Sequence, residues 1–116
     1  MFDIKFITSP IALSELRSIA EKQFGSLVKA VVDIDKKRMA IGGEMHADEE
    51  TYLINEGSKQ ENLWGINIYP DQPTEHRIEF DSMINIRPYM GNRSRGVENP
   101  ETQKIILAII KQLITE

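Results

Sequence analysis

The sequence contains no cysteine among its 116 residues. This absence excludes disulfides, thiolate catalysis and zinc sites built on cysteine ligands. Long hydrophobic runs are also absent, because the longest one, from Ile105 to Ile110, is far too short to span a bilayer. The first ten residues lack a basic segment followed by a long apolar run, so we expect no signal peptide and a cytoplasmic protein.

A general excess of basic residues is lacking as well. The formal net charge is −4, with 14 Lys and Arg against 18 Asp and Glu. Nucleic-acid-binding domains usually carry a basic footprint, so a nucleic-acid partner is disfavoured. The composition, 41% hydrophobic and 28% charged, is typical of a soluble globular protein. A chain of this length is large enough for one core, so we expect a single domain over residues 1–116.

The pattern of apolar residues predicts five strands and three helices. We expect strands near residues 3–8, 27–34, 38–42, 63–69 and 77–87, the last with a bulge or bend at Ser82 and Met83. We expect helices from Ser9-Pro10 to residue 24, from 47 to 56, and from Asn99-Pro100 onward. The order β-α-β-β-α-β-β-α predicts a two-layer α+β fold with a mainly antiparallel sheet of four to five strands. Its first six elements match the ferredoxin-like order. That order places the second strand at an edge, whereas residues 27–34 are apolar on both faces, which favours a central position.

Arginine is concentrated after the last predicted strand. Arg87, Arg93 and Arg95 occur with no acidic residue between Arg87 and Val97. Guanidinium groups present a fixed fork of donors that suits carboxylate or phosphate. We therefore predict an anion site formed by these arginines together with Asn92. The loop is not a standard phosphate-binding loop, because the required Lys and Ser or Thr do not follow its second glycine.

An alternative is that these arginines pair with Asp81, Glu79 or Glu44 and pin the loop to the sheet. Two acids at the start of the following helix, Glu98 and Glu101, would also repel a bound anion. Whether the loop over residues 88–98 is ordered without a ligand stays open at this point.

A second candidate site begins at Glu44. Glu44 and His46 are two residues apart, so an extended segment would point both side chains the same way. With Asp48 or Asp81 as a third group, they could form a metal-assisted site. In the version with Asp81, Glu44 and Asp81 hold Mg²⁺ or Mn²⁺ and His46 acts as base. The alternative is that His46 caps the following helix, whose first turn is acidic. Whether the protein uses a cofactor is unknown from the sequence, and no serine lies in a nucleophile elbow.

Two asparagines, Asn67 and Asn85, fall within predicted strands, although asparagine is a poor strand former. We predict that they supply neutral hydrogen bonds to a ligand near the arginine loop. The alternative is a solvated sheet face, since antiparallel sheets often have one polar side.

The C-terminal helix is more apolar than a single core face requires. We interpret it first as core and second as a homodimer interface, because excess apolar surface often marks a contact. A broad apolar face is formed by Ile105, Ile106, Ile109, Ile110, Leu113 and Ile114.

Five segments carry a resemblance to a known family: residues 23–33, 42–50, 57–67, 78–85 and 91–97. Together they resemble a family of short uncharacterised prokaryotic proteins, a domain of unknown function. The resemblance extends over nearly the whole chain. It implies no activity, cofactor or catalytic residue.

Three functions remain open from the sequence. The preferred one is a small cytoplasmic binding or regulatory module that recognises an anionic small molecule or an acidic protein partner through Arg87, Arg93 and Arg95. The alternative is a metal-assisted hydrolase or nuclease that uses Glu44, His46 and Asp81. A third is a structural or oligomerisation role without a ligand.

Overall fold

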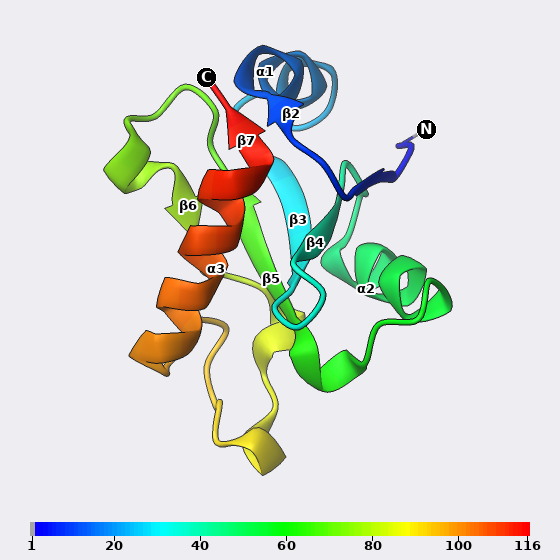
Figure 1. The fold of residues 1–116 in the computed structure, drawn as a ribbon, viewed down its shortest axis with the longest axis vertical. Coiled ribbons are helices and arrows are strands. Elements are labelled where there is room, and N and C mark those ends of the chain that lie inside the picture. Colours follow the sequence, from blue (N-terminus) through cyan, green and yellow to red (C-terminus); the bar gives the residue numbers. More distant parts are fainter. Residues whose placement is uncertain (1) are drawn as a thin grey trace.

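The computed structural model describes residues 2–116 and shows an antiparallel sheet with three α-helices packed against it (Figure 1). The sheet contains β1 (Lys5–Ile7), β3 (Val28–Asp33), β4 (Arg38–Ile41), β5 (Leu63–Ile68) and β6 (Ile78–Glu79), and the helices are α1 (Leu13–Lys22), α2 (His46–Asn55) and α3 (Pro100–Leu113). A separate parallel pair joins β2 (Ile11–Ala12) to β7 (Ile114–Thr115). Short 3₁₀ turns are η1 (Gln60–Asn62), η2 (Thr74–His76), η3 (Met83–Asn85) and η4 (Pro88–Met90).

The strand order β1-β4-β3-β5-β6 places β3 in the centre of the sheet. Every neighbouring pair in it is antiparallel. The predicted α+β class, with three helices and a mainly antiparallel sheet, is therefore confirmed, as is the central position of the strand that is apolar on both faces. A ferredoxin-like arrangement is not confirmed, because there the second strand would lie at an edge.

Helices cover both faces of the sheet, which adds a layer to the two that we expected (Figure 1). On one face, α1 and α3 close the main core, to which β3 contributes Val28, Ala30 and Val32. On the other face, α2 packs over a smaller cluster that includes Val31 and Leu63. Helices are needed on both faces because the side chains of the central strands alternate between the two faces and are apolar on each. Among residues 2–116, no helix combines the length and apolar composition that crossing a membrane requires.

Helix α1 begins at Leu13, three residues after the proline at which we expected it to start. The intervening Ile11 and Ala12 are extended because they pair with Ile114 and Thr115 of β7. Helix α3 begins where predicted, with the Asn99 side chain accepting a hydrogen bond from the Glu101 N–H at 2.9 Å.

The strand predicted over residues 77–87 is wrong beyond Glu79, although the chain does turn where a bend was expected, at Ser82 and Met83. Only Ile78 and Glu79 pair with β5, and the chain then turns into η3. Beyond this point the Asn85 side chain takes the place of a strand, since its amide accepts from the Gly65 N–H at 2.8 Å and donates to the Gly65 carbonyl at 3.0 Å. At Gly65 the edge of β5 is thus satisfied by one side chain, and the polar and apolar alternation after Asp81 reflects turns.

Candidate functional site

A cavity of about 310 Å³ lies between the start of α2, the α2-facing side of the sheet and residues 81–84. It is on the less apolar face of the sheet. Its polar lining residues are Lys29, His46, Asn67, Asp81, Ser82 and Arg95. Four of the nine predicted site residues thus meet at one place, although they are 49 positions apart in the chain from first to last.

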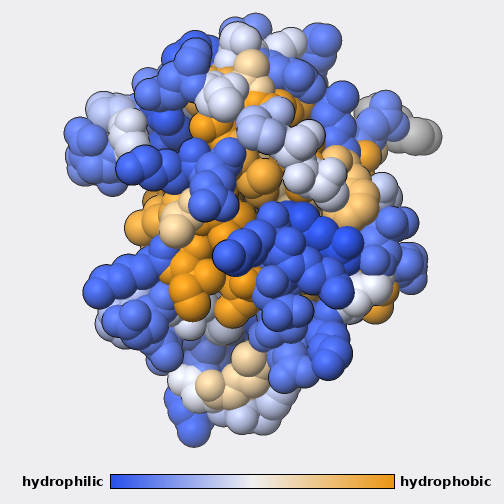
Figure 2. All heavy atoms as spheres, viewed as in Figure 1, coloured by the Kyte–Doolittle hydropathy of each residue, from blue (hydrophilic) through white to orange (hydrophobic). Residues whose placement is uncertain are grey.

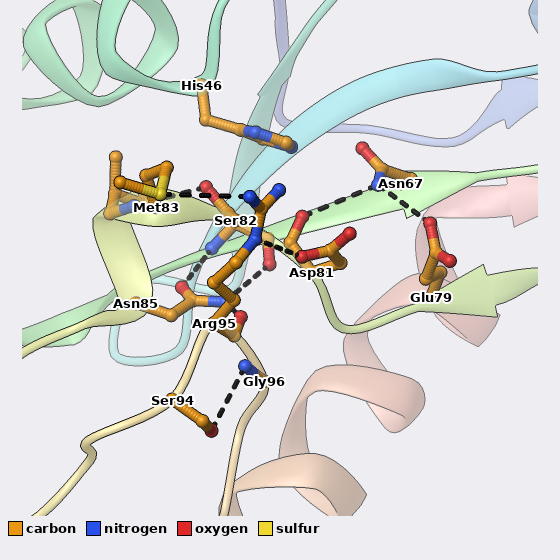
Figure 3. Close-up of polar contacts among 12 residues, drawn as sticks. His46, Asn67, Glu79, Asp81, Ser82, Met83, Asn85, Ser94, Arg95 and Gly96 are labelled. Atoms are coloured by element: carbon orange, nitrogen blue, oxygen red, sulfur yellow. Dashed lines mark hydrogen bonds and ion pairs between the residues drawn. The ribbon is translucent and has the colours of Figure 1, made fainter.

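The sheet register builds the floor of this cavity. Lys29 on β3 lies opposite Asn67 on β5, and Asn67 lies opposite Glu79 on β6. Cross-strand partners share a face of the sheet, so these three polar side chains form one row across three strands. Lys29 and Asn67 line the cavity, and Glu79 lies beside Asn67 outside it. The Asn67 amide nitrogen donates to Glu79 Oε1 at 2.9 Å and to the Asp81 carbonyl at 3.4 Å. Asn67 is thereby held with its amide oxygen turned toward His46 (Figure 3).

His46 is the first residue of α2, and its ring reaches across to β5. Its Nε2 lies 2.8 Å from the Ile66 carbonyl oxygen. A carbonyl oxygen only accepts, so Nε2 carries the proton and Nδ1 of the neutral ring keeps its lone pair. Desolvation by burial lowers the pKa of His46, and the Lys29 charge adds to this effect, while the Ile66 carbonyl and Asn67 oppose it. The predicted capping role is not seen, because no side-chain hydrogen bond caps α2.

Arg95 and Asp81 form an ion pair at the edge of the cavity (Figure 3). Arg95 Nε donates to Asp81 Oδ1 at 2.6 Å, and Nη1 lies 3.8 Å from the Met83 sulfur. Both charged side chains remain about half exposed, so the guanidinium keeps N–H groups that face solvent. Arg95 was predicted to pair with Asp81, Glu79 or Glu44 if its role were structural, and Asp81 is the partner.

Lys29 is the second cation of the site. Its Nζ donates to the Glu44 carbonyl at 3.0 Å and lies 4.8 Å from the centre of the Phe24 ring. Within residues 2–116 it makes no ion pair with a carboxylate. The cavity is therefore lined by two cations and a single carboxylate, Asp81.

Gly65 allows the segment after β6 to approach the sheet closely. A Cβ at this position would lie 2.5 Å from Ser82 Cβ, 2.6 Å from Ser82 Oγ and 3.2 Å from His46 Cδ2. The His46 ring thus presents its Cδ2 carbon toward Gly65. Ser82 Oγ accepts a hydrogen bond from the Ile84 N–H at 3.3 Å. The geometry does not pair Ser82 with a base, so a serine nucleophile is unsupported.

Arg87 does not join the cavity. Its guanidinium is buried, donates to the Gln60 carbonyl at 2.6 Å and the Leu63 carbonyl at 2.7 Å, and stacks 4.3 Å from the centre of the Trp64 ring. Burial lowers the pKa of Arg87. Arg87 therefore lies at the start of β5, and the three arginines do not converge as the sequence predicted.

The rest of the arginine loop is held by its own polar groups. The Asn92 amide nitrogen donates to the carbonyls of Asn85 and Gly96 at 2.8 Å, and its oxygen accepts from the Glu98 N–H at 2.9 Å. The Glu98 carboxylate accepts from the N–H groups of Arg93 and Ser94 at 3.0 and 2.8 Å. Hydrogen bonds from the Ser94 side chain and these N–H groups lower the pKa of Glu98. Asn85 and Asn92 thus position the loop, and Arg93 is exposed outside the cavity.

The predicted metal set is not assembled. Glu44 borders a different hollow, together with Phe2, Ile4, Gly43 and Asp48, whereas His46 and Asp81 border the cavity. Within the described part of the chain, no group of three or more His, Asp or Glu residues is placed to hold a metal ion. The geometry therefore does not support metal-assisted hydrolysis by Glu44, His46 and Asp81.

Two features of the site were missed by the sequence reasoning. Lys29 is the one charged residue in the first five positions of an otherwise apolar central strand, and Gly65 interrupts another strand. A charge inside a buried strand and a glycine in a strand interior both indicate a site or a close approach. These two signals could have located the cavity.

Comparison with known proteins places the chain in one family. No curated protein and no solved structure gives a significant match. A family described as "Protein of unknown function (DUF5674)" matches residues 5–113, in agreement with the resemblance found in the sequence. The chain belongs to this family of proteins of unknown function.

Proposed function

We propose that this chain is a cytoplasmic binding module for a small anionic molecule, which Arg95 and Lys29 hold in the cavity beside α2. The observation that carries this proposal is the excess of positive charge. Two cations from different elements border the cavity, and only Asp81 opposes them among its lining residues. A half-exposed guanidinium and an ammonium without a carboxylate partner are suited to carboxylate or phosphate groups.

Neutral groups and the shape of the cavity support the same function. Asn67 and the neutral His46 ring provide hydrogen-bonding groups without adding negative charge. The N-terminus of α2 borders the cavity and adds partial positive charge there. The volume of about 310 Å³ is within the range of about 300–1,000 Å³ that is usual for small-molecule sites.

The test is a thermal-shift series with small carboxylates, phosphates and nucleotides. An anion present at about 100 times its dissociation constant stabilises the native protein by about 2.7 kcal/mol, which raises the melting temperature. We expect the shift to be lost in Arg95→Gln and in Lys29→Gln. Arg93→Gln is the matched control, because it removes an equally charged side chain from outside the cavity.

Two outcomes would contradict the proposal. If no anion shifts the melting temperature of the wild-type protein, the cavity is not an anion site. If Arg93→Gln removes the shift as fully as Arg95→Gln does, the anions act through overall surface charge.

A homodimer through α3 is a separate proposal, supported by exposed apolar residues on this helix. Figure 2 shows hydrophobic residues gathered in the middle of the face that carries α3. Leu107, at 44% exposure, borders a groove of about 490 Å³ that also includes Ile78, Ile110 and Ile114. The residues that line the groove carry both signs of charge. Arg77 pairs with Glu116 within the chain at 3.0 Å, and Lys111 and Glu75 remain as opposite charges that two copies could bring into contact.

Sedimentation velocity tests this interface. We expect wild-type protein to form a dimer that Leu107→Glu dissociates. Ile54→Glu is the control, because Ile54 is similarly exposed, at 41%, on the other side of the sheet. A wild-type monomer at all concentrations, or a dimer that survives Leu107→Glu, would contradict this interface.

A further inference from the structure

Large apolar side chains cluster around the mouth of the cavity. Phe24, Met45 and Met83 are 40%, 57% and 66% exposed, and all three line it. Exposed apolar residues are common when scattered singly, but a group of them around one hollow indicates a surface that a ligand covers. The cavity therefore has an apolar mouth above a polar floor.

The charges in the floor indicate how much negative charge a ligand brings. Lys29 and Arg95 are opposed by Asp81, which leaves one positive charge uncompensated. Glu79 stands beside Asn67 but does not line the cavity. A ligand with one negative charge balances the site, whereas a dianion leaves an excess of negative charge next to Asp81.

The geometry of Arg95 distinguishes between types of anion. Its Nε is occupied by Asp81, and Nη1 also lies 3.8 Å from the Met83 sulfur, which is only a weak acceptor. The remaining N–H groups of the two terminal nitrogens are therefore the donors for a ligand. These lie in the plane of the guanidinium, which suits the two coplanar oxygens of a carboxylate. The Met45 and Met83 side chains are flexible and make favourable contacts with aromatic rings.

From the apolar mouth, the single surplus charge and the free edge of Arg95, we propose that the ligand is a monocarboxylate with an aromatic ring. This inference rests on the proposed function, because it specifies which anion the cavity binds. The carboxylate lies between Arg95 and Lys29, and the ring contacts Phe24, Met45 and Met83. The volume of about 310 Å³ favours one ring system over a nucleotide.

The test compares the affinities of matched probes. Each probe is titrated into the full chain, and binding is monitored by two-dimensional NMR of the backbone amides. Phenylacetate is the probe, acetate lacks its ring, phenylacetamide lacks its charge, and phenyl phosphate carries up to two negative charges. We expect phenylacetate to bind about tenfold tighter than each of the others, because burying a ring adds apolar contact and the floor accepts one charge. The largest amide shifts are expected at the start of α2 and at Ser82 to Ile84.

Variants separate the two halves of the cavity. Met45→Gln weakens phenylacetate binding and leaves acetate binding unchanged, whereas Arg95→Gln weakens both. Met90→Gln is the control, because Met90 is an exposed methionine that does not line this cavity. It leaves the affinity for both probes unchanged.

The possible failures are distinguishable. If acetate or phenyl phosphate binds as tightly as phenylacetate, the ligand class is wrong while the proposed anion site stands. If phenylacetamide binds as tightly as phenylacetate, the charge plays no part and both proposals fail. If no probe and no other anion binds, the proposed function itself is overturned.

Discussion

The two faces of the sheet bury different kinds of side chain, and β5 shows the difference within one strand. Toward α1 and α3 it presents Trp64, Ile66 and Ile68, which belong to the main core. Toward α2 it presents Leu63, Gly65 and Asn67, of which only Leu63 is a large apolar residue. The same backbone thus supports a closed apolar core on one side and a polar, partly open cavity on the other.

This comparison indicates how a small protein can combine stability with a site. The face under α1 and α3 buries most of the apolar core, so it supplies most of the hydrophobic stabilisation. The face under α2 has a smaller apolar cluster, and the space left at one end contains Lys29, Asn67 and His46. The protein can place polar groups on this face because the opposite face supplies most of the hydrophobic stabilisation.

The largest effect is expected from damage to the closed face. Ile106 on α3 is fully buried in the main core, so Ile106→Ala leaves a cavity and lowers the free energy of unfolding by about 2–5 kcal/mol. The neighbouring Ile105 is 42% exposed, and Ile105→Ala should cost less than about 1 kcal/mol. Urea denaturation measures both. Equal losses in the two variants would show that the face under α1 and α3 is not the main source of stability.

The α2 face contains a buried carboxyl, which makes its stability depend on pH. Glu49 is fully buried, and its Oε2 accepts from the Gly43 N–H at 2.9 Å. Desolvation by burial raises the pKa of Glu49 well above its ordinary value, with the Gly43 hydrogen bond and Lys29 opposing this shift. Above a pH of about 4.3, Glu49 is ionised in the unfolded chain but still protonated in the native protein, so unfolding releases its proton. The free energy of unfolding therefore falls as the pH rises, by at most about 1.4 kcal/mol per pH unit, until the pH passes the folded-state pKa.

Glu49→Gln keeps the acceptor for Gly43 and removes the titrating group. We expect the variant to be more stable than the wild type at pH 8, with a difference that shrinks toward pH 4. Glu56→Gln, an exposed substitution near the end of the same helix, should show no such trend. Urea denaturation at several pH values is the measurement, and a pH-independent difference would mean that Glu49 is ionised in the native state.

A smaller effect is expected from a substitution that adds a side chain between Gly65 and Ser82, where the two segments now lie in close contact. In Gly65→Ala the new Cβ would lie 2.5 Å from Ser82 Cβ, so the segment after β6 must shift. We expect a loss of about 1–3 kcal/mol, as is usual for overpacking. Gly96→Ala is the control, since a Cβ there meets no atom closer than 3.5 Å. In Gly65→Ala/Ser82→Gly the stability should partly recover, and a purely additive loss in the double variant would contradict the proposed contact.

The sequence predicts elements best where apolar periodicity alone decides the structure. Residues 27–34 are apolar on both faces, and β3 is indeed central. Helix α3 begins at Pro100 because Asn99 and Pro100 are local signals that need no tertiary partner. The predicted strand over residues 77–87 is wrong because the Asn85 side chain satisfies β5 in place of backbone. This replacement of a strand by a side chain depends on a contact with a residue 20 positions away, which the apolar periodicity of the sequence does not reveal.

The candidate site was predicted less well, because residue type does not reveal which way a side chain points. Asn67, Asp81 and Arg95 were recognised by type, and the structure brings them together with His46. Arg87 is of the same type and close in sequence, yet its guanidinium caps two carbonyls of the β5 region. Distinguishing these arginines requires their distant contacts, the Gln60 and Leu63 carbonyls for Arg87 and Asp81 for Arg95, which residue type leaves undetermined.

The smallest predicted effects come from Arg87 and Arg95, and they test this distinction directly. Arg87→Lys loses the fork across the Gln60 and Leu63 carbonyls and the stacking on Trp64, so it should lower the free energy of unfolding by about 1–2 kcal/mol. Arg95→Lys changes only a half-exposed ion pair with Asp81 and should cost less than about 0.5 kcal/mol. In anion titrations the order reverses, because only Arg95 lines the cavity. Urea denaturation and titration of both variants measure this, and the assignment fails if Arg95→Lys costs more stability than Arg87→Lys, or if Arg87→Lys weakens anion binding as much as Arg95→Lys does.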